Sequence, residues 1–194
     1  MNEAKKKDEG VEMRVISVTE SGKKITSGEL AQAEALRKEG NDLNSQGKFA
    51  LALEKIEESL KIQSKNATAL NNSGVALDGL GRREEALKRF KAAIKIKPDH
   101  AIALCNSGGT LERLGRHEEA LQQLEMALKI APDYTAALYN SGFVLEKLER
   151  YEEALQKIEA VLKIQSDHPQ ALSKKKALLE KMEQIQHESK KMRA

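Results

Sequence analysis

The sequence has 194 residues, of which 32% are charged and only 3% are aromatic, with no Trp. This length suits one ordinary domain or one short repeat array, and the abundance of Ala, Glu, Lys and Leu favours helix over strand. Cys105 is the single cysteine, which excludes an intrachain disulfide and is typical of a reducing compartment. Because no apolar run reaches the length of a secretory core or a membrane span, we expect a cytoplasmic protein with no membrane span.

The formal net charge is +3, and it is unevenly distributed along the chain. Residues 1–32 hold equal numbers of Lys/Arg and Asp/Glu, whereas residues 169–194 hold seven Lys or Arg against three Glu. The middle of the chain is therefore near neutral. This distribution argues against nucleic-acid binding along the body of the protein, because phosphate contacts need basic residues.

Residues 1–25 mix Lys, Glu, Gly, Ser and Thr without a helical period, and this predicts a disordered or loosely attached tail. An alternative is that the apolar residues Val15, Ile16 and Val18 form a short strand or a docking segment. The tail is followed by Thr26-Ser27-Gly28-Glu29, which has the pattern of a capping box. This motif predicts the start of the first helix.

A unit of 34 residues then repeats four times without insertion or deletion. The units are 33–66, 67–100, 101–134 and 135–168, and together with the preceding cap they make one domain, 26–168. A period of this length indicates stacked copies of one supersecondary unit. Small and apolar residues recur at fixed positions of every unit, namely Gly40, Gly74, Gly108 and Gly142; Ala52, Ala86, Ala120 and Ala154; and Leu36, Leu70, Leu104 and Leu138.

The spacing within each unit predicts two helices joined by a turn. In unit 67–100, apolar and small residues three and four positions apart define one face of each helix. Gly81 marks the turn, and Pro98 ends the second helix. The combination of Gly74 with Ala86 lets the two helices approach closely, because neither side chain holds them apart.

The chain after residue 168 predicts a ninth helix over 169–188, followed by a basic tail over 189–194. Pro169 suits a first helical turn, and Leu172 and Leu178 begin an apolar face at helical spacing. The lysines lie on the other side of this helix. A helix with one apolar and one charged face is typical of the cap at the end of a repeat array.

The pattern resembles the tetratricopeptide repeat family. The resemblance covers residues 33–168 and implies an all-α fold, a right-handed superhelical α-solenoid of antiparallel helix pairs. The family's usual Trp is Leu in all four units, and the end units depart most from the pattern, as is typical of capping units. In the second unit the residues that carry the resemblance are Leu70, Gly74, Leu77, Ala86, Phe90, Ala93 and Pro98.

The resemblance also implies that the first helix of each unit lines a concave groove that binds a peptide. Asn72, Asn106 and Asn140 are one repeat apart, so we expect a ladder of amides, each with a donor and an acceptor for a peptide backbone. The alternative is that these amides bond neighbouring helices or water. The full set of candidate groove residues is Arg37, Lys38, Asn41, Asn71, Asn72, Asn106, Arg113, Tyr139, Asn140 and Phe143.

Tyr139 and Phe143 lie one helical turn apart beside Asn140, and this predicts an apolar pocket for an anchoring side chain of a partner. The alternative is that Phe143 packs against the C-terminal helix. The four histidines fall at turns or in the C-terminal segment, and the sequence contains no metal-binding spacing, phosphate loop or nucleophile elbow. We therefore expect no enzymatic activity, no cofactor and no metal.

These observations favour a protein–protein interaction scaffold or adaptor that binds an extended segment of a partner protein in its groove. Two other functions stay open. One is a self-assembling structural scaffold, in which the last helix or the tail docks into another copy and makes a homo-oligomer. The other, which is less favoured, is RNA binding by a helical-repeat array through the C-terminal lysines, although few aromatic residues are present to stack bases.

Overall fold

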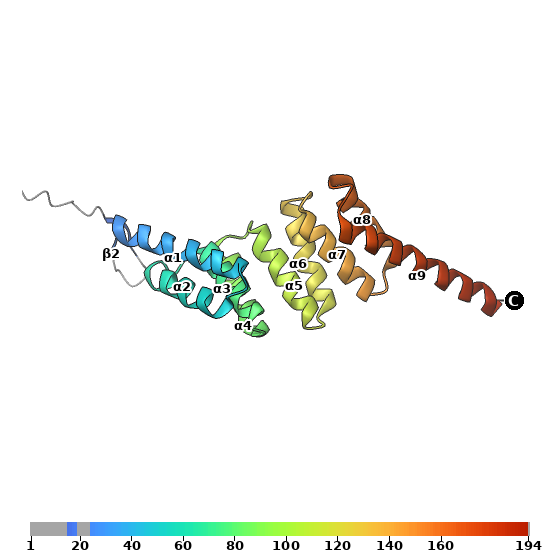
Figure 1. The fold of residues 1–194 in the computed structure, drawn as a ribbon, viewed down its shortest axis with the longest axis horizontal. Helices are drawn as coiled ribbons and strands as arrows, with labels where there is room; N and C mark the ends of the chain where they lie inside the picture. Colours follow the sequence, from blue (N-terminus) through green and yellow to red (C-terminus); the bar gives the residue numbers. More distant parts are fainter. Residues whose placement is uncertain (1–14, 19–23, 194) are drawn as a thin grey trace, which may run out of the picture.

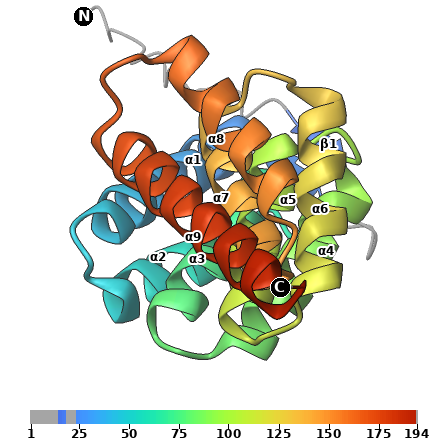
Figure 2. The same cartoon turned by 90° about the vertical axis from the view of Figure 1, so that its right-hand side faces the viewer.

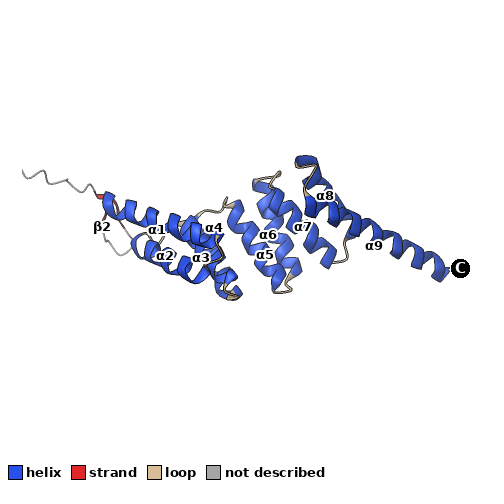
Figure 3. Ribbon diagram, viewed as in Figure 1, coloured by secondary structure: helices blue, strands red, loops and turns tan. Residues whose placement is uncertain are grey.

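The computed structural model describes residues 15–18 and 24–193 of the chain. These residues form a row of helices packed one after another, with the N-terminal end at one end of the row and α9 at the other (Figure 1). Figure 3 shows that helices make up nearly all of this row. The helices are α1 (Ser27–Ser45), α2 (Phe49–Ile62), α3 (Ala67–Gly79), α4 (Arg83–Ile96), α5 (Ala101–Arg113), α6 (His117–Ile130), α7 (Thr135–Lys147), α8 (Tyr151–Ile164) and α9 (Pro169–Arg193).

Each helix packs mainly against the helices next to it in the chain, and the closest packing is within each unit, between α1 and α2, α3 and α4, α5 and α6, and α7 and α8. The first helices of successive units also touch one another. The predicted fold class, an all-α solenoid of helix pairs, is confirmed. None of the described helices is long and apolar enough to cross a membrane.

A short antiparallel hairpin precedes the helices. Its strands are β1 (Val15–Val18) and β2 (Lys24–Thr26), with Val15 opposite Thr26. Of the two alternatives for the apolar residues at 15–18, the strand is the one that the structure shows. Residues 1–14 and 19–23 lie outside the described part of the chain, so the loosely attached tail stays a prediction.

The start of α1 is fixed by the predicted capping box. The backbone N–H of Glu29 donates to Thr26 Oγ1 over 3.2 Å, and the backbone N–H of Thr26 donates to Glu29 Oε2 over 2.9 Å. Two N–H groups that a helix start leaves unpaired are thereby satisfied. Ile25, directly before the cap, is 3% exposed and holds the hairpin against the first unit.

The turns inside the units need a left-handed backbone. Gly81 has a φ of +77°, and Gly47 and Gly115 have similar values of +72° and +73°. Glycine adopts this conformation at no steric cost. The fourth unit has Glu149 there instead, with a φ of 59°. The predicted turn at Gly81 is confirmed.

The close approach of the two helices in each unit has a direct steric basis. A Cβ atom placed on Gly74 would lie 2.5 Å from Cε1 of Phe90, and one on Gly108 would lie 2.7 Å from Cγ of Leu124. The corresponding distances at Gly40 and Gly142 are 2.4 and 2.8 Å. The recurring alanines opposite these glycines are all fully buried. Only glycine therefore fits at these four positions.

The C-terminal helix α9 continues the row beyond the last repeat (Figures 1 and 2). Ala171 and Leu178 are fully buried where it packs against the fourth unit. The helix runs to Arg193, through most of the segment expected to be a basic tail over 189–194. The physical reason is that no Gly or Pro follows Pro169 to end it, and Lys, Glu and Gln are good helix formers.

Two adjacent glycines in α5 provide a test of this packing. Gly108→Ala should lower the free energy of unfolding by roughly 1–3 kcal/mol, because the methyl group would overlap Leu124. Gly109→Ala should raise it by up to about 1 kcal/mol, because the new Cβ meets nothing nearer than 3.9 Å and alanine favours helix. Urea unfolding of both variants measures the difference. Equal effects of the same sign would show that the register of α5 against α6 is wrong.

The capping box gives a second prediction. Thr26→Ala should lower the free energy of unfolding by about 1 kcal/mol, because the N–H of Glu29 loses its acceptor at the helix start. Ser27→Ala, one residue farther on, is the matched control and should change it by a few tenths at most. Thermal unfolding of both variants provides the measurement. If Ser27→Ala lowers the free energy of unfolding and Thr26→Ala does not, Thr26 is not the N-cap of α1.

Candidate binding groove

Seven of the ten predicted groove residues line two hollows along the first helices, namely Arg37, Asn41, Asn71, Asn72, Asn106, Arg113 and Asn140. Residues of adjacent first helices meet at an offset of 35 positions, as in the contacts of Asn71 with Asn106 and of Cys105 with Asn140. Since the repeat has 34 residues, α5 is shifted by one residue against α3, and α7 against α5, at these contacts. Residues at the same position of successive units therefore lie near each other without being direct partners.

The asparagines at the N-terminal end of this face bond one another. Asn44 Nδ2 donates to the backbone carbonyl of Asn72 over 2.9 Å, and Asn71 Nδ2 donates to Asn72 Oδ1 over 3.2 Å. Asn106 Nδ2 donates to Asn71 Oδ1 over 3.0 Å. Asn71 and Asn72 are 4% and 6% exposed. The bonds between neighbouring helices are made by the side-chain amides of Asn44 and Asn106, whereas the Asn72 amide bonds Asn71 within α3, so the ladder of Asn72, Asn106 and Asn140 stays a prediction.

Arg37 is the charged residue of α1 that lines the same hollow as these asparagines. This hollow has a volume of about 440 Å³ and also contacts Asn41 and His100. Arg37 is paired with Glu34 over 2.6 Å, and its hydrogen bond lowers the pKa of the Glu34 carboxyl. Lys38 lies 3.9 Å from the same carboxylate. Glu34 therefore offsets the positive charge that α1 offers to an anionic ligand.

Burial lowers the pKa of His100 at the edge of this hollow, with a further contribution from the positive charge of Lys97. The imidazole is therefore neutral at neutral pH, and it acts as a hydrogen-bonding group without charge.

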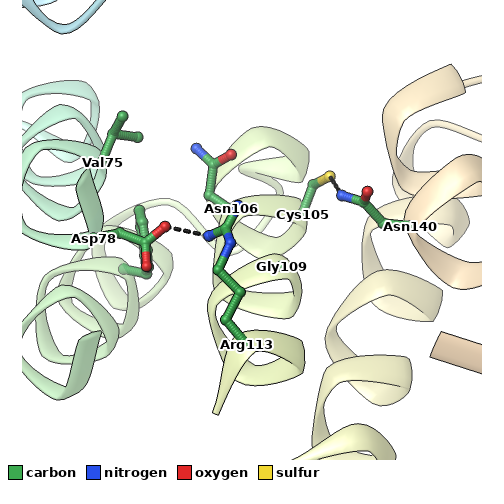
Figure 4. Close-up of a pocket in the computed structure, with 8 residues that line it drawn as sticks. Val75, Asp78, Cys105, Asn106, Gly109, Arg113 and Asn140 are labelled. Atoms are coloured by element: carbon green, nitrogen blue, oxygen red, sulfur yellow. Dashed lines mark hydrogen bonds and ion pairs between the residues drawn. The ribbon is translucent and has the colours of Figure 1, made fainter. Parts of the chain in front are cut away.

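A second hollow lies at the middle of the face, around Gly109 (Figure 4). We call it the central hollow; its volume is about 160 Å³, and its lining is Val75, Asp78, Phe90, Cys105, Asn106, Gly109, Arg113 and Asn140. The residues that occupy the position of Gly109 in the other units are Asn41, Val75 and Phe143. The missing side chain at Gly109 therefore leaves space that the other units fill.

Arg113 forms one wall of the central hollow and is paired with Asp78 of α3 (Figure 4). Asp78 also lies 3.8 Å from Nε of Arg83, so two guanidinium groups face one carboxylate. The side chain of Arg113 is 51% exposed. A guanidinium has five N–H donors, and the pair with Asp78 leaves some of them for a ligand.

Cys105 and Asn140 form the other wall, where Asn140 Nδ2 donates to Cys105 Sγ over 3.6 Å (Figure 4). Burial raises the pKa of the Cys105 thiol, which is only 2% exposed. Burial also raises the pKa of the adjacent Tyr134 to about 12. Both groups are therefore neutral at neutral pH and contribute packing and weak hydrogen bonds.

Both aromatic residues that were expected to share an anchoring pocket lie beside residues of α9. Phe143 lies under the ammonium groups of Lys174 and Lys147, which are 4.7 and 5.3 Å from its ring centroid. Lys174 belongs to α9 and is also paired with Glu146 over 2.7 Å. Tyr139 stacks on His168 with 5.8 Å between the ring centroids. Phe143 therefore takes the alternative position, against the C-terminal helix.

The feature that sequence reasoning missed is the central hollow itself. Of the two adjacent glycines in α5, Gly108 packs against Leu124, whereas a Cβ on Gly109 would meet nothing nearer than 3.9 Å. The available signal was that Gly109 has no side chain at a position where each of the other three units has one. In the described part of the chain, no three His, Cys, Asp or Glu side chains gather in a way that could hold a metal ion.

Comparison with known proteins relates this fold and groove to a family. Two models described as tetratricopeptide repeat match residues 66–133 and 111–179. A comparison with curated proteins finds no match.

Three solved structures illustrate the similarity in fold. One from a functional characterization of Pseudomonas aeruginosa pilF has a TM-score of 0.75 at 22% identity, over 81% of this chain and 72% of that chain. A MamA protein gives 0.67 at 20% identity, over 79% and 82%. YrrB, whose structure is titled "a TPR protein with an unusual peptide-binding site", gives 0.64 at 27% identity, over 74% of each chain.

The buried position of Cys105 gives a prediction about its reactivity. A dithiodipyridine reagent should modify Cys105 in the folded protein at neutral pH at least about tenfold more slowly than in the unfolded chain, because burial hides the sulfur and disfavours the thiolate. Asn140→Ala should speed the reaction, since it removes a covering side chain and its hydrogen bond. Absorbance at the thione band follows the rate. Equal rates in the folded and unfolded chains would show that the wall of the central hollow is open.

Proposed function

Since this chain belongs to the tetratricopeptide repeat family, we propose that it is a non-enzymatic interaction scaffold or adaptor that holds an extended segment of a partner protein along its first helices. The segment would lie across α1, α3, α5 and α7. As part of the same proposal, the chain acts in the cytoplasm.

The observation that carries this proposal is the unfilled space at Gly109. Glycine in a helix interior is about 1 kcal/mol less favourable than alanine. At Gly74 and Gly108 this cost is offset by packing, but a Cβ on Gly109 would meet only Asn140 Nδ2, at 3.9 Å. A glycine without a packing reason is typical of places where another backbone or ligand approaches closely.

The polar groups around the central hollow suit a peptide. Asn106 and Asn140 each donate one N–H within the protein, and each amide has a second N–H and an oxygen acceptor. An extended backbone presents both kinds of partner at every residue. Arg113 adds donors for a carbonyl or carboxylate of the segment. This supports a role for Asn106 and Asn140 in binding, whereas Asn72 has its main role inside the array.

The similarity to YrrB supports the same proposal, because its printed title describes a peptide-binding site and it is 27% identical to this chain. The other two structures named above are below that level of identity, so they support the fold alone.

Filling the central hollow tests the proposal. Gly109→Phe should abolish capture of the partner from a lysate of the source cells while leaving helicity and the melting temperature near those of the wild type, because its Cβ has room. Gln122→Phe, an equally large substitution at an exposed position of α6, is the matched control and should keep the partner. Quantitative mass spectrometry of the captured proteins is the measurement.

Each outcome of this experiment has a defined meaning. A protein retained by the wild type and by Gln122→Phe, but lost by Gly109→Phe, identifies the client of the groove. Retention by all three at equal levels would contradict the proposal. If the captured protein is a second copy of this chain, the groove serves self-assembly.

A further inference from the structure

A third hollow, which is not part of the groove, lies on the other side of α5. We call it the outer hollow; it has a volume of about 370 Å³ between α4, α5 and α6. Leu87, Ile94, Leu111 and Met126 give it apolar walls, and Lys91 and Ser107 are among its polar groups. None of these residues lines the central hollow.

The first two units show what normally occupies this place. Glu57, which lies one repeat before Lys91, accepts a hydrogen bond from Ser73 Oγ over 2.9 Å. The same carboxylate is paired with Arg89 over 2.8 Å. A glutamate of α2 therefore connects the buried serine of α3 with an arginine of α4.

The equivalent residues one unit later cannot make these contacts. Ser107 corresponds to Ser73, but Lys91 replaces Glu57 and Gln123 replaces Arg89. Ser107 has no hydrogen-bonded carboxylate within the described residues, and no ion pair of Lys91 is found there. Arg116, which also lines the outer hollow, is already paired with Glu119 and Glu84. Ser107, Lys91 and Gln123 therefore offer donors in the place of one carboxylate, and Glu119, which is paired with Arg116, is the acidic residue of the lining.

At the next interface Glu125 and Lys157 take the places of Lys91 and Gln123, but Ser141 Oγ, at the position of Ser107, is buried without a hydrogen-bond partner among the described residues. Met126 is a further exception, because Ala92 and Ala160 are its counterparts in the neighbouring units. Its side chain is 43% exposed at the mouth of the outer hollow. Methionine is flexible and polarizable, and it is frequent on surfaces that bind apolar side chains.

We propose that the outer hollow is a second binding site, which receives a partner segment carrying a large apolar side chain beside an Asp or Glu carboxylate. The carboxylate takes the place that Glu57 holds one unit earlier, accepts hydrogen bonds from Ser107 Oγ and the Gln123 amide, and pairs with Lys91. The apolar side chain lies between Leu87, Ile94 and Met126. Lys91 has no acidic partner of its own to displace, so the charge complementarity is available to the ligand.

A pair of small probes tests the chemistry of this site. In a titration followed by amide chemical shifts, 4-phenylbutanoate should shift the signals of Ser107, Leu111 and Met126. Its uncharged analogue 4-phenylbutanol should bind the same residues about tenfold more weakly, because it lacks the charge-assisted hydrogen bonds. Equal affinities of the two probes, or the absence of these shifts with the acid, would overturn the proposal.

A variant that restores the residues of the first two units should fill the outer hollow, and we call it the closing variant. Lys91→Glu with Gln123→Arg restores the acid and base of the first two units, so it should place a carboxylate over Ser107 and abolish binding of the acid. Lys88→Glu with Gln122→Arg makes the same charge changes at exposed positions outside the outer hollow and should leave binding unchanged. Binding retained by the closing variant would contradict the proposal.

A peptide library then identifies which residues the partner segment must carry. From a displayed library of random peptides, those captured by the wild type but not by the closing variant should share an acidic residue within one turn of Leu, Met, Phe or Trp. Gly109→Phe should capture the same peptides, because the groove is on the other side of α5. If the enriched peptides contain no acidic residue, the proposal for the outer hollow is wrong. This result would not affect the proposed function of the groove.

Discussion

The contact on which this structure depends is the approach of a glycine in each first helix to a large side chain of the second. At Gly74 the ring of Phe90 occupies the space that any Cβ would need, and Leu124 does the same at Gly108. This contact fixes how the two helices of a unit cross. Four copies of one crossing, spaced by 34 residues, give units of the same shape, and identical units that stack in the same way form a solenoid.

The sequence was sufficient to predict the fold because every element of this contact repeats. The glycines, alanines and leucines recur with the period, the turn glycines have the positive φ that their position implies, and Thr26 caps α1 as expected. The contacts between units were not predictable in the same way. The period aligns Asn72 with Asn106, but the one-residue shift between helices makes Asn71 the partner of Asn106. That shift comes from how whole helices pack, which no single position in the sequence encodes.

The two candidate binding sites have a common origin in departures from the repeat. Several positions that follow the pattern have a partner inside the array, as Gly108 has in Leu124 and Glu57 has in Ser73. Lys91 breaks the pattern and Gly109 lacks the side chain that the other units have at its position, and each leaves a place without its usual occupant. In a repeat protein, equivalent positions of the units can be compared directly. An exceptional residue in one unit then shows which side chain is missing there and what shape of ligand would replace it.

Gly109 lies in α5 of the third unit, and Lys91 lies in α4 of the second unit, where it lines the outer hollow beside α5. An inner unit of a solenoid packs against neighbours on two sides, whereas an end unit has one neighbour and must also cover an exposed end. Gly109 weakens α5, and Lys91 lacks the ion pair that Glu57 makes one unit earlier. Both are therefore tolerated where two interfaces support the helices. Gly108 holds α5 against Leu124 between the two sites, with Gly109 facing one hollow and Ser107 the other. The stability that the regular positions provide is what allows the irregular ones to be kept for binding.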